Sequence, residues 1–300
     1  MTDRRSYIGG PDAATICALN PWQTPYELWA RKTGRVGDVE MNERMELGLL
    51  MEEPILKHYE KREGVHLDYP GTVKDKDGVT YFGGSPDAEV RGQQKGVEAK
   101  LVGVNMASKF SDDEVPENYY AQVSWYMGVT GYNVWDLCAL IGTDFKVFHL
   151  ERDDEVIGMM RERCHKFWKD HVLADVPPEV SAGDSDTLKQ MFPQNKGNFL
   201  MADESDLVNA ELLRGVRKGE AALKEQKAVL ENMFKERIGD ADGMDLGEEG
   251  RLTWKKSKDG TRLDAKALAA DPACPQDLIE KHTGIRPGSR RFLTPRGWTK

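Results

Sequence analysis

Two carboxylates and one lysine are grouped in the stretch Tyr81–Lys100. Short β-type runs around the turn Gly92–Gly96 predict a β-hairpin, with Asp87 on one arm and Glu98 and Lys100 on the other. Glu98 and Lys100 are two residues apart, so their side chains leave the same face of a strand, and antiparallel pairing can bring Asp87 opposite that face. The carboxylates suit a hard divalent cation such as Mg²⁺, and the lysine can orient or deprotonate a water or hold a phosphate oxygen.

Taken alone, this grouping also has a simpler interpretation. Glu98 and Lys100 could form an exposed cross-strand ion pair, which contributes roughly 0–1 kcal/mol. The chain contains another Glu-x-Lys sequence, at Glu225–Lys227, from which no chemistry is expected. The catalytic interpretation therefore depends on the rest of the chain.

A helix expected over residues 42–63 carries an acid in the middle of its apolar stripe. The stripe consists of Met45, Leu49, Leu56 and Tyr59. Glu52 stands at the position that completes this spacing, and an inward-facing acid is costly unless it is paired or bound to a metal. Pro54 removes one helical donor and predicts a kink or local break. One alternative is that Glu52 faces solvent at this kink. Another is that the adjacent acid, Glu53, is the one that faces inward.

The composition is that of a globular cytoplasmic protein. The chain has 300 residues, enough for one large domain or two small ones, and 39% of them are hydrophobic. No apolar run approaches the roughly 18 residues that span a bilayer, and the polar N-terminus does not open a signal peptide. The four cysteines are scattered without metal-binding spacing, so we expect reduced, mostly buried thiols. His165 and His171 are expected on a helix surface.

The charge is unevenly distributed along the chain. The net charge is −9, which argues against indiscriminate coating of DNA but allows a nuclease with a local basic track. Residues 251–300 contain twelve Lys and Arg against five Asp and Glu, a net charge of +7, so residues 1–250 carry −16. We therefore expect the basic C-terminal part to contact duplex backbone, with a solvated face on a structural module as the alternative.

The order of elements predicts an α/β (α+β) core followed by separate C-terminal parts. Helices, a small strand cluster with an inserted helix, and a closing helix indicate a mixed central sheet flanked by helices over residues 1–175. Residues 176–203 are rich in Pro, Gly, Ser and Asp and predict a linker. Residues 204–239 predict one long helix with a heptad seam, a helical arm, and residues 240–300 a small basic module.

Four segments together resemble the phage-type YqaJ exonucleases, relatives of phage lambda exonuclease in the PD-(D/E)xK nuclease superfamily. These segments are IGGPDAATICALNPWQTPYELWARKTG, LGLLMEEP, GGSPDAEV with GVEAK, and YYAQVSWYMGVTGYNVW. They cover roughly the first 150 residues in the order of the family. The resemblance implies a PD-(D/E)xK restriction-endonuclease-like core.

The resemblance also implies roles for individual residues. Asp87 and Glu98 would be metal ligands and Lys100 the catalytic lysine, while Glu52, four residues after Gly48, would help the metal site. Gln122 matches the glutamine of the following helix, which orients the scissile phosphate or the lysine.

Further positions match contacts to a 5′-phosphate. These are Ser85 and Arg4, with Arg5 as the alternative to Arg4. Pro11 stands where the family often has Ser, so the hydroxyl that helps to bind the terminal phosphate is missing and only the helix N-terminus remains there. Preference for a phosphorylated end is therefore weakened in this chain.

The implied activity is that of a Mg²⁺-dependent 5′→3′ exonuclease on double-stranded DNA ends, with Mn²⁺ as a substitute. It would leave 3′ single-stranded tails for phage-type recombination in the cytoplasm of a bacterial host, beside a single-strand annealing protein and as a trimer. The alternatives are a structure- or site-specific endonuclease on the same core, a nuclease acting on RNA, and a non-catalytic protein that binds DNA ends.

Overall fold

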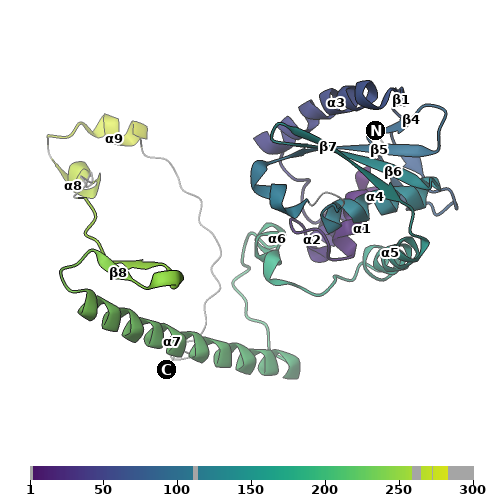
Figure 1. The fold of residues 1–300 in the computed structure, drawn as a ribbon. Helices are drawn as coiled ribbons and strands as arrows, with labels where there is room; N and C mark the ends of the chain where they lie inside the picture. Colours follow the sequence, from purple (N-terminus) through teal and green to yellow (C-terminus); the bar gives the residue numbers. More distant parts are fainter. Residues whose placement is uncertain (1–2, 111–113, 259–264, 272, 283–300) are drawn as a thin grey trace. The chain divides into compact units, whose positions relative to one another are not determined.

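The computed structural model describes residues 3–110, 114–258, 265–271 and 273–282. The chain divides into two compact units, Met1–Phe192 and Pro193–Lys300 (Figure 1).

A five-stranded mixed sheet forms the centre of the first unit, with the strand order β1-β4-β5-β6-β7. Its strands are β1 (Leu67–Asp68), β4 (Ala88–Val90), β5 (Lys95–Val102), β6 (Val134–Ile141) and β7 (Asp144–Glu151). The pair β5–β6 is parallel, whereas the other neighbours are antiparallel. Parallel neighbours need a crossover connection, and α4 (Glu117–Thr130) lies in that connection. The predicted α/β architecture with a mixed central sheet is confirmed.

The remaining elements of this unit lie around the sheet. The helices are α1 (Gly10–Ile16), α2 (Pro25–Lys32), α3 (Glu43–Glu63) and α5 (Asp154–Phe167), which continues into the π-helical turn η3 (Trp168–Leu173). Two short 3₁₀ helices are η1 (Arg4–Ser6) and η2 (Val104–Lys109), and a second, two-stranded sheet pairs β2 (Val73–Lys74) with β3 (Gly83–Gly84). The α3 helix begins where the Asn42 side chain accepts the N–H of Met45, and it ends at Gly64 in the left-handed conformation.

Helices cover both faces of the sheet (Figure 1). On one face, Leu56 and Tyr59 of α3 pack against Val97 and Ala99 of β5. On the other face, α1, α4 and α5 enclose the larger apolar cluster, in which Trp125, Trp135 and Leu137 are fully buried. The sheet is therefore the middle layer of an α/β/α arrangement, and β5 has side chains in both apolar layers.

Only the second half of α3 packs on the sheet. The buried residues of the helix are Ile55, Leu56 and Tyr59, whereas Met45 and Leu49 are 40% and 55% exposed. The predicted inward stripe is therefore wrong for its first half. The predicted break at Pro54 is also absent, since α3 runs through this residue without interruption.

Part of the predicted linker belongs to the first unit. Residues 182–191 form η4 (Ala182–Asp184) and α6 (Ser185–Met191). Asp184 is fully buried and accepts hydrogen bonds from the hydroxyl of Thr24, the N-cap of α2, and from the N–H of Ser181 at 2.6 Å. Ser, Gly and Asp therefore serve here as caps of short packed helices. Composition alone cannot distinguish this role from a linker.

The second unit contains one long helix and small elements. These are α7 (Glu204–Ile238), β8 (Gly243–Asp245), η5 (Gly247–Glu249), β9 (Arg251–Thr253), α8 (Ala265–Ala270) and α9 (Gln276–His282). The predicted long helix corresponds to α7, which begins at the capping box of Asp203 and Asp206. Much of the predicted basic module, including residues 283–300, lies outside the described residues.

The cysteines and the apolar segments of the described residues were also subjects of prediction from composition. Cys17, Cys138 and Cys164 are buried free thiols, as predicted, and Cys274 is partly exposed. None of the helices in the described ranges combines the length and the apolar character needed to cross a membrane.

The close packing of Gly96 against Trp135 gives a test of this sheet. A Cβ at Gly96 would lie 2.3 Å from the Trp135 ring, which is itself fully buried. We expect Gly96→Ala to reduce the free energy of unfolding by about 1–3 kcal/mol because the core cannot expand. The matched control is Gly158→Ala in α5, where a Cβ meets open space and should stabilise the helix by roughly 0.5–1 kcal/mol. Urea unfolding measures both, and equal effects would contradict the packing.

Candidate active site

The β4–β5 hairpin brings the first acid to the second. Ala88 pairs with Val97, and Asp87 is the residue before this pair. The Oδ2 atom of Asp87 accepts a hydrogen bond from the N–H of Ala99 at 2.8 Å. This bond holds the Asp87 carboxylate beside β5, at the level of Glu98. The hairpin turn is shorter than predicted, since β5 already begins at Lys95 where it pairs with β6.

Glu98 lies at the centre of the site and is only 1% exposed. Its Oε1 atom accepts hydrogen bonds from Lys100 Nζ and from Gln122 Nε2, each at 2.5 Å. Its Oε2 atom is buried and has no hydrogen-bond partner among the described residues. The interpretation of Glu98 and Lys100 as an exposed ion pair is therefore wrong.

Two tyrosines of α4 complete the surroundings of these groups. Gln122 Nε2 also donates to Tyr126 Oη at 3.2 Å, and Tyr126 Oη donates to the carbonyl of Ser85 at 3.3 Å. Lys100 Nζ lies 5.7 Å from the centre of the Tyr119 ring. No role in the site was predicted for these tyrosines from the sequence. Their spacing of three and four residues from Gln122 places all three on one helix face, which was the signal for a shared site.

Close approach of α1 to α4 fixes Gln122 and Tyr126. A Cβ at Gly10 would lie 2.8 Å from Gln122 Cγ and 2.9 Å from Tyr126 Cζ. Only glycine allows the backbone of α1 to lie against these two side chains. The first helix of the chain is thereby a wall of the site.

The structure separates Glu52 from Glu53. Glu52 is half-buried on α3, and burial together with the charge of Asp87 raises the pKa of its carboxyl group. Glu53 is exposed and forms an ion pair with Lys57 at 2.5 Å. Glu52 is therefore the acid of α3 that shares the electrostatic environment of Asp87.

Burial and like charges raise the pKa values of the acids. Burial is the main cause for Asp87, opposed by Lys100 and by the N–H of Ala99. Burial and the neighbouring Asp87 raise the pKa of Glu98 to about 8. Burial alone would lower the pKa of Lys100, but Glu98 and Asp87 outweigh it, so the amine is held as an ammonium. Glu98 thus lacks enough positive charge around it for full ionisation at neutral pH.

These residues fit a divalent cation. The buried Glu98 Oε2 without a partner and the adjacent carboxylate of Asp87 are oxygen donors of the kind that Mg²⁺ prefers. Within the described ranges, no three His, Cys, Asp or Glu side chains form a complete cluster of metal ligands, although Glu52, Asp87 and Glu98 influence one another electrostatically. A cation held by Asp87 and Glu98 would complete its shell with water and substrate phosphate, as is usual for Mg²⁺.

The N-terminal segment is anchored beside the site by a buried lysine. Lys32 Nζ donates to the carbonyls of Arg4 and Tyr7 at 2.6 and 2.5 Å and to Asp12 Oδ2 at 2.7 Å. Burial raises the pKa of the Tyr126 hydroxyl, and the positive charge of Arg4 opposes this effect, so the two side chains interact electrostatically. Arg4 makes no ion pair with another described residue.

The other residues predicted to bind phosphate are placed differently. Arg5 lies 4.0 Å from Asp38 and close to Gly34, so its side chain is directed to the end of α2. Ser85 is exposed and its hydroxyl shares a hydrogen bond with Thr72 at 3.2 Å. Pro11 in the short helix α1 offers no donor, and the N–H of the preceding Gly9 is already bound by Asp12.

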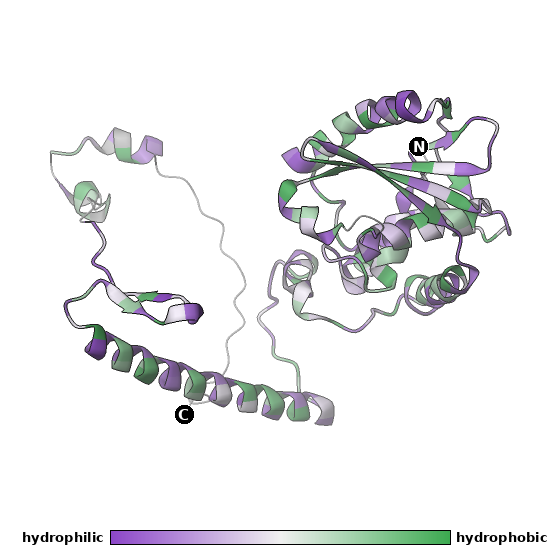
Figure 2. Cartoon of the chain, in the orientation of Figure 1, coloured by the Kyte–Doolittle hydropathy of each residue, from purple (hydrophilic) through white to green (hydrophobic). Residues whose placement is uncertain are grey.

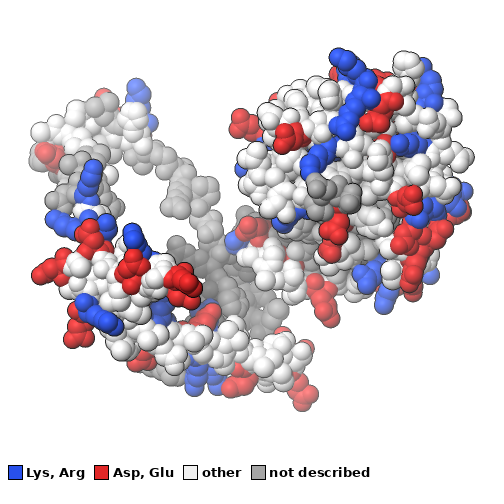
Figure 3. Space-filling view, viewed as in Figure 1, with Lys and Arg blue, Asp and Glu red and all other residues white. Residues whose placement is uncertain are grey.

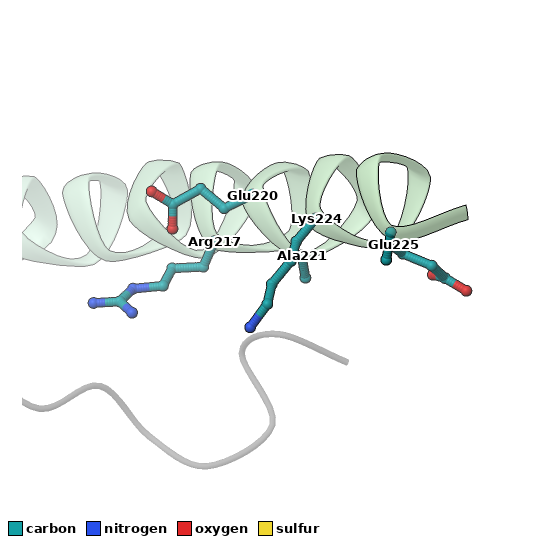
Figure 4. A pocket seen from close by; sticks show the side chains of 6 residues that line it. Arg217, Glu220, Ala221, Lys224 and Glu225 are labelled. Atoms are coloured by element: carbon teal, nitrogen blue, oxygen red, sulfur yellow. The ribbon is translucent and has the colours of Figure 1, made fainter. Parts of the chain in front are cut away.

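A hollow on α7 in the second unit contains none of these residues. It is lined by Arg217, Glu220, Ala221, Lys224, Glu225 and Ala228, all from one helix (Figure 4). The charged side chains point in different directions, and no acid pair like that of Asp87 and Glu98 is formed.

Comparison with known proteins identifies the family. Residues 1–133 match the model of the YqaJ-like viral recombinase domain. The protein YqaJ of Bacillus subtilis (strain 168) is 30% identical over 295 residues, which are 95% of this chain and 91% of that protein. The chain belongs to the YqaJ family. The resemblance predicted from the sequence motifs is thereby confirmed, and because the match to YqaJ covers 95% of the chain, it includes most of the second unit.

Two solved structures are similar to this member of the YqaJ family at low identity. The alkaline exonuclease LHK-Exo from Laribacter hongkongensis has a TM-score of 0.48 and 18% identity, over 58% of this chain and 91% of that chain. A phage-related exonuclease from Haemophilus somnus 129PT has a TM-score of 0.44 and 15% identity, over 56% of this chain and 96% of that chain.

The raised pKa of Glu98 predicts how stability depends on pH. A folded-state pKa of about 8, above the ordinary 4.5, means that folding favours the neutral carboxyl. The contribution of this group to stability is present below pH 4.5 and is lost as the pH rises through about 8. We therefore expect the melting temperature of the metal-free protein to fall, relative to that of Glu98→Gln, between about pH 4.5 and 8.

Thermal melting in the presence of a chelator measures this difference, with Glu53→Gln as the control at an exposed acid. Addition of Mg²⁺ at about pH 9 should raise the melting temperature of the natural protein and not that of Glu98→Gln, since a cation requires the ionised carboxylate. A difference between natural protein and Glu98→Gln that does not change with pH would contradict the environment described for Glu98.

Proposed function

We propose that this member of the YqaJ family is a Mg²⁺-dependent exonuclease that degrades one strand of double-stranded DNA from its 5′ end. The observation that carries the proposal is the buried Glu98, with one oxygen fixed by Lys100 and Gln122 and the other without a partner beside Asp87. Burying a carboxylate in this way is costly unless a cation completes the site. Membership of a viral recombinase family supports a DNA substrate.

Each residue of the site has a separate role in the proposed phosphodiester hydrolysis. Asp87 and Glu98 would hold the cation, which when bound polarises a phosphoryl oxygen and activates a water. Gln122 keeps Glu98 Oε1 in place, so that Oε2 would be available to hold the cation. Because Lys100 is held as an ammonium by two acids, its role in this mechanism is to orient the water and hold a negative phosphate oxygen rather than to remove a proton.

The charges on the first unit are mixed in sign. Figure 3 shows Lys and Arg side chains together with Asp and Glu side chains on its visible face, and the whole chain carries −9. Binding of a nucleic-acid backbone would therefore depend on individual basic side chains near the site, without indiscriminate binding elsewhere. In this proposal the 3′ tails pass to a single-strand annealing protein in the cytoplasm of a bacterial host, and Mn²⁺ substitutes for Mg²⁺. The trimer implied by the resemblance stays a prediction.

Substitution of the central residues tests the assignment. We expect Asp87→Ala and Lys100→Ala each to reduce degradation of an end-labelled linear duplex in Mg²⁺ by about 10²-fold or more, because each removes a group that acts on the phosphate or the water. Glu52→Ala should also reduce the rate, whereas its exposed neighbour Glu53→Ala should leave it unchanged.

The same assay contains its metal and substrate controls. Ca²⁺ should support binding of the duplex but not cleavage, because it takes a looser and larger oxygen shell than Mg²⁺. Closed circular duplex should remain intact. Near-natural activity of Asp87→Ala would exclude the proposed site, and cleavage of the circle would favour the endonuclease alternative.

The placement of Arg4 and Arg5 predicts how the rate of degradation depends on a phosphate at the 5′ end of the duplex. We expect a weak preference for a 5′-phosphoryl over a 5′-hydroxyl duplex, since Pro11 lacks the hydroxyl found in relatives. One missing neutral hydrogen bond corresponds to about tenfold or less. Arg4→Ala should abolish most of this preference, whereas Arg5→Ala, whose guanidinium lies toward Asp38, should retain it.

Initial rates on the two duplexes measure the preference for each variant. The ratio of the rates is independent of a general loss of folded protein, so a structural defect in Arg4→Ala would not imitate the expected result. Equal rates on both ends in the natural protein would show that no site for a terminal phosphate exists.

A further inference from the structure

The α7 helix carries an apolar seam that is exposed along its length. Leu212, Val216, Leu223, Leu230 and Met233 are each 57–67% exposed. Together with Gly219 and Gln226 they alternate in steps of four and three residues, which is the spacing of a helix that packs against another helix. No contact among the described residues buries this seam.

The other side of α7 differs in character. It contains the hollow of Figure 4, where charged side chains alternate with Ala221 and Ala228. Figure 2 shows the same division as hydrophobic and hydrophilic stripes along the helix. α7 is therefore a two-sided helix of 35 residues, and its apolar seam extends over about three heptads, from Leu212 to Met233.

We infer that a second copy of this chain covers the seam, through antiparallel pairing of two α7 helices. The argument rests on the residues that flank the seam on one side, Leu213, Glu220, Lys227 and Phe234. In an antiparallel pair centred near Leu223, these positions meet their own equivalents across the two-fold axis. Glu220 then faces the partner's Lys227, and Leu213 faces the partner's Phe234. Both kinds of contact on this flank of the seam are therefore complementary.

A parallel pair lacks this complementarity. There the same flanking residues would face the other edge of the seam, so that Glu220 meets the partner's Gly215 and Lys227 the partner's Ala222. Both charges would lack a partner on the other helix. The antiparallel arrangement also places Gly219 near the partner's Leu230, where a missing side chain leaves room for a large one. Gln226, the one polar side chain of the seam, would fix the register.

The apolar seam supplies the affinity and the charged pair supplies the orientation. Exposed ion pairs contribute little individually. Lys227 at present lies 3.7 Å from Glu231 on its own helix, an exposed contact that can be exchanged for one with the partner's Glu220. Glu220 itself forms no ion pair with another described residue.

Light scattering of the full chain over a range of concentrations tests the inference. We expect Leu223→Asp to reduce the number of copies in the assembly, because a charge enters the middle of the seam. The matched control is Leu207→Asp, which changes an equally exposed leucine of α7 that lies outside the seam, and it should associate like the natural protein. Identical masses for both variants at all concentrations would overturn the inference. A monomeric natural protein would also overturn it, because the seam would then be exposed, covered by another part of the same chain, or bound by a different protein.

Charge exchange tests the orientation without disturbing the seam. Glu220→Lys and Lys227→Glu should each weaken association by roughly tenfold, because two like-charge contacts replace two ion pairs. The double variant should restore it. Failure of the double variant to recover would exclude the antiparallel pairing. Since none of these residues belongs to the proposed nuclease site, cleavage by isolated copies should be unchanged, which separates this test from that of the function.

Discussion

The burial of one carboxylate organises the first unit. Glu98 is almost inaccessible to solvent, and its ionised form is tolerated only because Lys100 and Gln122 donate to one of its oxygens. Three elements have to meet for this: β5 carries the acid and the lysine, α4 carries the amide, and α1 holds α4 in place through the close approach at Gly10. The remaining free oxygen, beside Asp87, is the feature that a divalent cation would satisfy.

The surroundings explain why neighbouring residues of the same type are not equivalent. Glu52 lies half-buried near Asp87, while Glu53 pairs with Lys57 in solvent. The backbone of Arg4 is held by Lys32, which binds its carbonyl, while the side chain of Arg5 extends toward Asp38. In each pair a rotation of about 100–120° along a helical turn separates the two side chains, so the choice depends on what each face meets.

The second unit follows a different principle. The core of the first unit is closed by helices on both faces of the sheet, whereas none of the described residues buries the apolar seam of α7. A seam with heptad spacing and self-complementary flanks is a surface adapted to a second helix. The family relationship covers this part of the chain as well as the core, so assembly through α7 would accompany the proposed catalytic site.

The sequence by itself determined the elements and the identity of the candidate residues. Local signals, such as the caps Thr24 and Asn42 and the stop at Gly64, act over a few residues and are readable without the fold. The hairpin spacing already placed Asp87 beside Glu98. Tertiary structure decided what surrounds them: that Glu98 is buried, that the second half of α3 alone packs on the sheet, and that residues 182–191 complete the core instead of linking it. These outcomes depend on contacts between residues distant in sequence, which periodicity and composition do not record.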